Sequence, residues 1–523
     1  MRKPARRAAN NHKGITLSLK VNILANYTGH VYVTVLNLVM VPLYLRYMGV
    51  EAYGLVGFFA MLQLWFQLLD IGLTPTMSRE AARFLGGATD LLSLRRLLRA
   101  LECIFVASAL MGAAIIIGSA DAIATHWLKA QSLPLAEVRH ALMLMALLIA
   151  LRWIAGLYRG AISGLEQQVW LNGFNMTVAT VRSVLVLPLF LWVGSTPTHF
   201  FAFQLIIAVV ETGWLVRQCY RLLPLNPGSG RLRWEWAPLR GVLKFSLSVA
   251  FTSSVWVMIT QTDKLVLSRL LPLAEYGYFT LAVLVAGGVM LISGPISAAL
   301  QPRITSVAAS GDQAGVIRIY RKCTQLVTLL CVPAALLLAF FPAEVLWTWT
   351  GNAEIAQQAA PVLVLYAIGN GVVAVSAMPY FLQFAKGNMR LHVIGGAFLA
   401  VLLIPALVWS SQKYGALGAG YTWLCANVTY FLTWVPLIHR HFLHRLHLRW
   451  LSTDIGFITL PPLIGAFLLH ALVPLPKARL PLGIVLACLG ILLLLLAAAG
   501  SSCVRELCRA KWGWADFSII KEG

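Results

Sequence analysis

Charge is what this chain has least of. Only 11% of its 523 residues are Asp, Glu, Lys or Arg, whereas 59% are hydrophobic. A soluble domain carries about 25% charged residues. The longest polar connections run for only about 20 residues, which leaves no room for a separate soluble domain.

Acidic residues are the scarcer of the two signs. The sequence holds 19 Asp and Glu against 41 Lys and Arg, for a formal net charge of +22. If both termini are cytoplasmic, most of the Lys and Arg fall on the inner side of the membrane, as the positive-inside rule requires. The basic excess then reflects topology and attraction to the anionic inner leaflet of a phospholipid bilayer. It argues against nucleic acid as a partner.

Signals for disulfides, metal sites and catalysis are also missing. The eight cysteines lie in apolar runs or on the inner side, and no spacing matches a metal site. The histidines of "HRHFLHRLHLRWLS" (439–452) alternate with arginines, which favours a basic interfacial helix over metal binding. No catalytic constellation appears, so we expect neither an enzyme nor a cofactor. The basic start of the chain is not followed by a compact apolar core and cleavage site, which indicates a retained first span.

Long apolar runs fill the rest of the chain. Each run is about 20 residues or more, enough to cross a hydrocarbon core of about 30 Å. The sequence therefore predicts an all-α polytopic membrane protein with about 14 transmembrane helices. The predicted spans are 17–45, 53–75, 98–118, 138–163, 171–194, 199–222, 241–270, 276–300, 321–341, 357–384, 391–411, 416–438, 453–474 and 482–501.

An internal repeat lies in the spacing of several residues. "GVEAYGLVGFF" (49–59) resembles "PLAEYGYFTLA" (272–282), so that Tyr53 and Gly54 match Tyr276 and Gly277 at an offset of 223. The same offset carries Arg95 onto Arg318, Arg99 onto Lys322 and Gly164 onto Gly387. A constant offset over more than a hundred residues indicates duplication of a structural unit.

Six predicted spans separate the matched points, and an even number preserves orientation in the membrane. This predicts two parallel, pseudo-symmetric six-helix lobes, 1–222 and 241–438, joined by a cytoplasmic linker, 223–240. Residues 439–523 then form a basic interfacial segment, two further helices and a cytoplasmic tail. Two such lobes around a midplane site are typical of an alternating-access transporter.

Polar side chains follow one face of several predicted helices, at helical spacing. Such stripes either line a cavity or hold helices together by hydrogen bonds. Taken jointly, the stripes favour a cavity. The polar lining predicted for it is Asn22, Asn26, His30 and Asn37 in the first span, Gln63, Gln67 and Asp70 in the second, and Tyr366 and Asn370 in the tenth.

Full charges occur deep inside four predicted helices, where each costs about 2.5–3.5 kcal/mol and usually marks an interior or a pathway. They are Arg152, Arg182, Glu211, Asp263 and Lys264. Arg182 and Glu211 could form a structural pair, and Asp263 and Lys264 could neutralise each other. The remaining surplus is positive, and a cationic interior selects an anionic cargo.

Two stretches carry a family likeness. "NILANYTGHVYVTVLNLVMVPLYLRYMGVEAYGLVGFFAMLQLWFQLLDIGLTPTMSREAA" resembles the first two helices of polysaccharide-type flippases of the MATE-like superfamily. "TDKLVLSRLLPLAEYGYFTLA" resembles their seventh and eighth helices. The resemblance covers about the first 440 residues, and two extra C-terminal helices are common in the polysaccharide branch.

The resemblance implies a transporter of the bacterial inner membrane that flips undecaprenyl-diphosphate-linked oligosaccharide, the repeat unit of O-antigen or exopolysaccharide, to the periplasmic leaflet. Polysaccharide polymerases and glycosyltransferases would be its functional partners. By position, Asp70, Asp263 and Lys264 match polar sites of the family pattern. We assign Lys264, with Arg152 and Arg182 chosen by depth alone, to cargo binding, and Asp70 and Asp263 to ion coupling, if coupling exists.

Other lipid-linked cargo, including a peptidoglycan precursor, stays open, and so do two other functions. A multidrug or cation antiporter of the same superfamily would share the lobes, but it would favour carboxylates in its cavity. A membrane polysaccharide polymerase or transferase would need a large outer loop or an acidic inner motif, and the sequence has neither.

The predicted topology can be tested directly. Reporter fusions or cysteine labelling should place residues 1–15, 223–240 and 505–523 inside and residues 342–356 outside. A C-terminus found outside would remove one span and break the argument for parallel repeats.

Overall fold

The computed structural model describes residues 3–70, 72–224, 237–443 and 446–506. Side chains before Val21 and most of those in 237–252 are not described. The linker predicted at 223–240 and the tail end of 439–523 therefore lie largely outside the described residues. Within them the chain is helical, without a named strand, as predicted. Internal contacts divide it into two units, 1–277 and 278–523.

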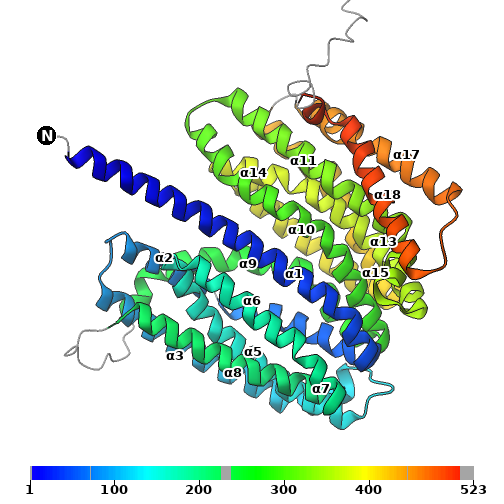
Figure 1. The fold of residues 1–523 in the computed structure, drawn as a ribbon, viewed down its shortest axis with the longest axis horizontal. Helices are drawn as coiled ribbons and strands as arrows, with labels where there is room; N and C mark the ends of the chain where they lie inside the picture. Colours follow the sequence, from blue (N-terminus) through cyan, green and yellow to red (C-terminus); the bar gives the residue numbers. More distant parts are fainter. Residues whose placement is uncertain (1–2, 71, 225–236, 444–445, 507–523) are drawn as a thin grey trace, which may run out of the picture. The chain divides into compact units, whose positions relative to one another are not determined.

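Among the described residues, the first unit holds the helices α1 to α9 and the start of α10 (Figure 1). They are α1 (Lys3–Phe66), α2 (Leu73–Leu85), α3 (Leu91–Gly118), α4 (Ala120–Ala122), α5 (Leu135–Gly164), α6 (Gln168–Val184), α7 (Val186–Trp192), α8 (Pro197–Leu222), α9 (Ala237–Leu270) and α10 (Leu273–Ala309). Two short segments of other helical types, η1 (Gln67–Asp70) and η2 (Ile123–Trp127), interrupt the series. A buried core forms where α2, α3, α5 and α8 meet, and in it the rings of Phe105 and Trp153 lie 5.0 Å apart between centroids, tilted by 32°.

The second unit contains the rest of α10 and the helices that follow it. Its further helices are α11 (Gln313–Phe340), α12 (Pro342–Thr350), α13 (Ala353–Ser376), α14 (Met378–Ala385), α15 (Arg390–Phe442), α16 (His447–Arg449), the π-helix η3 (Trp450–Gly456), α17 (Phe457–Leu472) and α18 (Arg479–Gly500). By contacts, α9 groups with the first unit rather than the second. The six-helix lobes and their parallel repeat stay a prediction.

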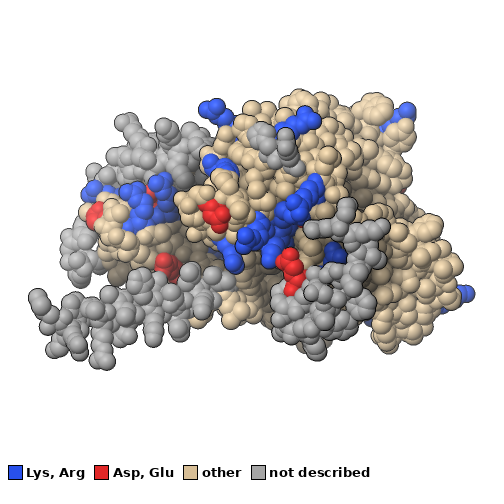
Figure 2. Space-filling view, turned by 90° about the horizontal axis from the view of Figure 1, so that it is seen from above, with Lys and Arg blue, Asp and Glu red and all other residues tan. Residues whose placement is uncertain are grey.

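The predicted spans correspond to helices of the described residues. Eleven helices are long and apolar enough to cross a membrane. Two of these, α1 and α15, are each two helices merged across a glycine in the left-handed region, Gly49 (φ 82°) and Gly415 (φ 57°), where L side chains rarely fit. With α9 added, fourteen segments result. On the face drawn in Figure 2, Lys and Arg side chains are more prominent than those of Asp and Glu.

Three predicted spans differ in detail from the observed helices. The span 53–75 is broken, because α1 ends at Phe66 and η1 turns the chain into α2. The span 171–194 is divided at Leu185 into α6 and α7, with Pro188 in the first turn of α7. The span 453–474 begins as the π-helix η3 and then carries Pro461 and Pro462 inside α17. Proline removes a helical hydrogen bond, so such breaks have a local cause.

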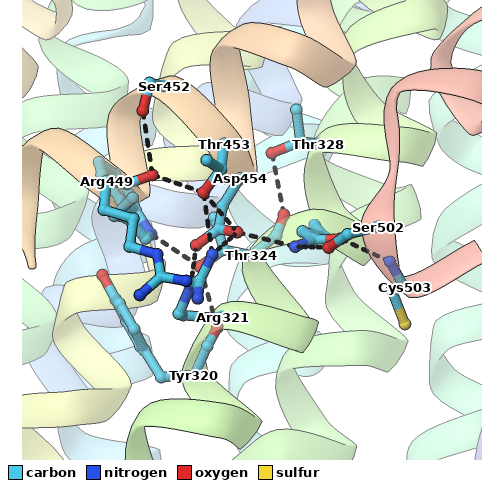
Figure 3. A network of polar contacts seen from close by, with 12 residues as sticks. Tyr320, Arg321, Thr324, Thr328, Arg449, Ser452, Thr453, Asp454, Ser502 and Cys503 are labelled. Carbon is cyan, nitrogen blue, oxygen red and sulfur yellow. Dashed lines mark hydrogen bonds and ion pairs between the residues drawn. The ribbon is translucent and has the colours of Figure 1, made fainter. Parts of the chain in front are cut away.

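The last two long helices are fastened to α11 by a buried polar network (Figure 3). Asp454 is fully buried and accepts two hydrogen bonds from Arg321, at 2.6 and 2.8 Å. Gln325 donates to Asp454 at 2.7 Å, and its side-chain oxygen accepts from Ser501 and from the Cys503 backbone N–H, both at 3.0 Å. The hydrogen bonds from Arg321 and Gln325 satisfy the carboxylate of Asp454, and a charged group in an apolar setting requires such partners.

The repeated Tyr-Gly motifs meet in the first unit. A Cβ atom at Gly54 would lie 2.4 Å from the carbonyl oxygen of Leu273, and one at Gly277 would lie 2.6 Å from that of Val50. The turn before α10 is also held by Lys129, whose carbonyl accepts from the Leu273 N–H at 3.0 Å. Both glycines thus permit a reciprocal backbone contact between α1 and the start of α10.

We expect Gly54→Ala and Gly277→Ala to destabilise the protein, because backbone atoms cannot yield to an added methyl group as a flexible side chain can. Overpacking of this kind costs about 1–3 kcal/mol. The matched control is Gly213→Ala in α8, where no atom lies within 4 Å of the added Cβ and helix propensity favours alanine. The measurement is the thermal unfolding midpoint in detergent. Equal midpoints for Gly54→Ala and Gly213→Ala would refute the close contact.

Candidate functional site

Three arginines of α5 and α6 converge in the first unit. Arg152 and Arg159 lie seven residues apart on α5, two turns along one face. Arg182 lies in the last turn of α6. Of these, Arg152 and Arg182 were predicted as cargo ligands from their depth in the sequence.

Arg159 forms the ion pair that the sequence had suggested for Arg182. Its guanidinium donates to the carboxylate of Glu211 on α8 and to the side-chain oxygen of Asn175 on α6. Glu211 is 6% exposed, so it needs a cationic partner to be retained there. The alternative of an Arg182–Glu211 pair is therefore wrong. Arg182 forms no hydrogen bond or ion pair with a described residue.

A polar cavity of about 270 Å³ opens beside this ion pair. Helices α1, α5, α6 and α8 contribute its lining, which consists of Gly29, His30, Val33, Arg159, Asn172, Asn175, Val178, Ala179, Arg182 and Glu211. Two of its cations face one carboxylate, so its lining carries a surplus positive charge. The free guanidinium donors of Arg182 can bind an anion, with phosphate and carboxylate the best matches to their fork geometry.

Asparagines shape the wall of this cavity between α1 and α6. Asn172 donates to the side-chain oxygen of Asn26 and to the Gln168 carbonyl, the latter at 2.8 Å. A Cβ atom at Gly29 would lie 2.8 Å from the Asn172 side chain, so the glycine leaves room for that contact. Further along the same helices Tyr32 and Thr180 share a hydrogen bond of 2.6 Å.

Arg152 is held apart from any acid among the described residues. It donates to Gln63 at 3.0 Å and to Gln204 at 3.3 Å, and its guanidinium lies 5.1 Å from the centroid of the Phe59 ring. Its Nε is buried without a hydrogen-bond partner. Two amides and an aromatic face solvate this charge but do not neutralise it, so it adds to the positive potential of the helices that carry it.

The predicted polar stripes divide between cavity and contact. His30 lines the cavity, and Asn26 is bonded to a residue that lines it. Asn22 is half-buried, whereas Asn37 and Gln67 are exposed. For these three no role follows from the geometry, and their place in the lining stays a prediction.

Tyr366 and Asn370 lie in the second unit, both buried. Asn370 donates to the Ala286 carbonyl at 2.9 Å and accepts from the Trp423 indole at 3.1 Å, while Tyr366 stacks on the Trp423 ring. These contacts join α10, α13 and α15. A role in lining a cavity therefore stays a prediction, and helix–helix contact is what the geometry describes.

The two carboxylates assigned to ion coupling both have local partners. Asp70 accepts from the Thr74 hydroxyl at 2.9 Å and from its backbone N–H at 3.1 Å, at the start of α2. Asp263 is 2% exposed and pairs with Lys264, with 3.3 Å between carboxylate and ammonium. Lys264 also donates to the Thr260 carbonyl at 2.7 Å. Coupling and cargo binding at these positions stay predictions.

Two asparagines of the site were missed from the sequence. Asn172 and Asn175 share a face of α6 with Ala179 and Arg182, at intervals of three, four and three residues. That spacing is a helical stripe and would have found them. No group of three His, Cys, Asp or Glu side chains within the described ranges is arranged to hold a metal ion.

Known proteins share this architecture. A comparison with curated proteins by sequence gave no match. Among solved structures, a lipid II flippase, MurJ, in an inward closed conformation matches 94% of this chain and 100% of its own, at 15% identity and a TM-score of 0.67. An inward-facing multidrug resistance MATE family transporter of the MOP superfamily matches 78% and 95%, at 14% identity and a TM-score of 0.64.

A MOP superfamily transporter from Pyrococcus furiosus matches 81% of this chain and 95% of its own, at 15% identity and a TM-score of 0.51. At identities this low, the structural likeness shows the fold alone, and it is the fold of these MOP superfamily transporters. Residues 19–308 match the model of a family described as polysaccharide biosynthesis protein, as the resemblance of the helix pairs predicted. Since the match covers more than half of the sequence, the chain belongs to the polysaccharide biosynthesis protein family.

Proposed function

We propose that this protein flips an oligosaccharide linked through diphosphate to a polyisoprenoid lipid, undecaprenyl diphosphate in a bacterial inner membrane, from the cytoplasmic to the periplasmic leaflet. The observation that carries the proposal is the cavity lined by Arg159 and Arg182, whose positive charge is only partly balanced by Glu211. Alternating access would expose this cavity to each side in turn.

The chemistry of the cavity fits the linkage between lipid and sugar. A diphosphate carries negative charge and many acceptor oxygens, which the unpaired Arg182 can bind through several N–H groups. A volume of about 270 Å³ is slightly below that of common small-molecule sites, about 300–1,000 Å³. It suits a diphosphate and an adjoining sugar better than a whole repeat unit.

Release requires that the cations be spread rather than clustered. Arg159 is engaged by Glu211, Arg152 by two glutamines, and Arg182 by no described residue. Only one guanidinium is thus fully available to the cargo at once. We therefore expect the cavity to bind the cargo with moderate strength. A transporter needs moderate binding because the cargo must be released on the other side of the membrane.

Family and fold support the same cargo class. The matched family is named for polysaccharide biosynthesis, and one similar structure is that of a lipid II flippase. We place both termini at the cytoplasm and take polysaccharide polymerases and glycosyltransferases as functional partners. Coupling to an ion through Asp70 or Asp263 belongs to the proposal.

A cationic-drug antiporter is the competing function, because a MATE transporter shares the fold. An organic cation would meet Arg182 at the cavity and be repelled. Proteoliposomes that export a rhodamine dye but leave a lipid-linked saccharide in place would decide for the antiporter.

Arg182→Gln should reduce flipping of a fluorescent undecaprenyl-diphosphate-linked saccharide by at least about tenfold, since a lost charge-assisted contact is worth about 1.5–3 kcal/mol. Folded yield should stay near wild type because Arg182 supports no described contact. Arg139→Gln is the matched control, with an exposed ion pair to Asp121. The readout is dithionite quenching in proteoliposomes. Wild-type flipping by Arg182→Gln would exclude this cavity as the cargo site.

Arg159→Gln should behave differently and lower folded yield, because it leaves the Glu211 charge buried without its partner, at a cost of about 3–5 kcal/mol. The double change Arg159→Gln with Glu211→Gln should restore yield. Size-exclusion profiles of the purified proteins measure this. If Arg159→Gln alone folds normally, the ion pair does not stabilise the first unit.

The same logic separates two roles of Lys264. If it binds cargo, Lys264→Gln abolishes flipping and the double change Asp263→Asn with Lys264→Gln does not restore it. If the pair only neutralises itself, each single change harms folding and the double change restores yield and flipping together. A double variant that flips normally would remove Lys264 from the cargo site.

A further inference from the structure

The second unit carries an apolar groove between the two arms of α15. The chain turns back at Gly415, so residues 390–414 and 416–442 form an antiparallel pair of helices. A groove of about 620 Å³ runs between them. Large aromatic side chains, among them Phe398, Trp409 and Tyr421, flank positions where the side chains are small, Ala406, Cys425 and Ala426.

The groove offers little to a polar ligand. None of its lining residues is charged. Ser410 and Thr422 share a hydrogen bond of 2.6 Å, and Ser410 also bonds to the Gly418 carbonyl. The Trp434 indole donates to the Leu391 carbonyl at 3.0 Å. Since these polar groups have partners in the helix pair, the remaining surface suits an aliphatic chain rather than a sugar.

The length of the groove separates two kinds of aliphatic chain. Its lining extends from Phe398 to Tyr414 on one arm and from Tyr421 to Trp434 on the other. At 1.5 Å per residue the first arm alone spans about 24 Å. One leaflet of a bilayer has a hydrocarbon depth of only about 15 Å, half of the core. A groove that passes the midplane suits a chain longer than the acyl chain of a phospholipid.

A cation marks the hairpin end of the groove. The ammonium of Lys413 lies 5.7 Å from the ring centroid of Trp409 and 5.3 Å from that of Tyr414, and both rings line the groove. Lys413 is exposed, so it can contact a phosphate while an attached chain lies below it. The groove therefore presents an apolar length and a positive end.

From these features we propose that the α15 groove binds the polyisoprenoid chain of the lipid-linked cargo, with the phosphate end of the lipid near Lys413. This deepens the proposed function and rests on it for the identity of the cargo. The phosphate end near Lys413 is the same diphosphate that the arginine cavity binds in the proposed function, so the two sites hold it at different steps of transport.

The test is photolabelling of the full chain in proteoliposomes. Undecaprenyl phosphate with a diazirine on its chain should label residues of both α15 arms, mapped by mass spectrometry. Phosphatidylglycerol with a diazirine on an acyl chain, at the same concentration, should label them at least about tenfold less, since a shorter chain fills only part of the groove and makes fewer van der Waals contacts with it. Equal labelling by the two lipids would make the groove a bilayer-lipid surface and overturn the proposal.

Filling the groove provides a second readout. Ala406→Trp and Cys425→Trp should each lower undecaprenyl phosphate labelling of α15 by about tenfold or more, because the indole occupies the space that the chain would fill. Ile484→Trp on α18, an exposed apolar position outside the groove, should leave it unchanged. Labelling of α15 that survives in both groove variants would refute the site. Labelling that maps away from α15 in the wild-type protein would also refute it, and this result does not depend on any variant folding.

Lys413→Gln tests the charged end. It should weaken labelling by undecaprenyl phosphate but not by photoreactive undecaprenol, which has no phosphate; equal effects on both would remove the phosphate from the proposal. Labelling needs no transport, so the two proposals fail separately. Labelled α15 without flipping would contradict the proposed function, and flipping without labelled α15 would contradict the groove.

Discussion

Burial of positive charge in an apolar setting is the constraint on which the first unit depends. An isolated guanidinium at membrane depth is costly, and each arginine here meets that cost differently. Arg159 has a carboxylate, Glu211. Arg152 has two glutamines and an aromatic ring. Arg182 has only the cavity. The arrangement explains why helices α1, α6 and α8 carry amides that bond to the arginines of α5 in an otherwise apolar bundle.

The polar network of the second unit serves a different end. Asp454 is fully buried, yet Arg321 and Gln325 satisfy it from α11. Each of these three side chains has at least one partner within the network. Its effect is to fix η3 and the end of α18 against α11. A saturated network stabilises a bundle, whereas an unsaturated one, as at Arg182, can bind.

Hydropathy and spacing were sufficient for the helices, because a membrane span needs a long apolar run and little else. The Tyr53-Gly54 and Tyr276-Gly277 repeat was visible for a related reason, since backbones that approach so closely tolerate only glycine. The partner of Glu211 could not be read from sequence. Arg159 and Arg182 lie at membrane depths from which either could reach Glu211. The rotation of α5 and α6 about their axes determines that Arg159 is the partner.

A lipid-linked saccharide has a long apolar chain at one end and a charged linkage at the other, and no single environment solvates both. The first unit offers the charged linkage a cavity with an unpaired guanidinium. The second unit offers the chain a groove lined by uncharged, largely apolar side chains. Transfer between leaflets is opposed chiefly by the cost of moving the charged linkage through hydrocarbon, because the chain stays in an apolar medium throughout. In the function that we propose, the arginine cavity lowers this barrier, and the α15 groove selects the lipid by the length of its chain.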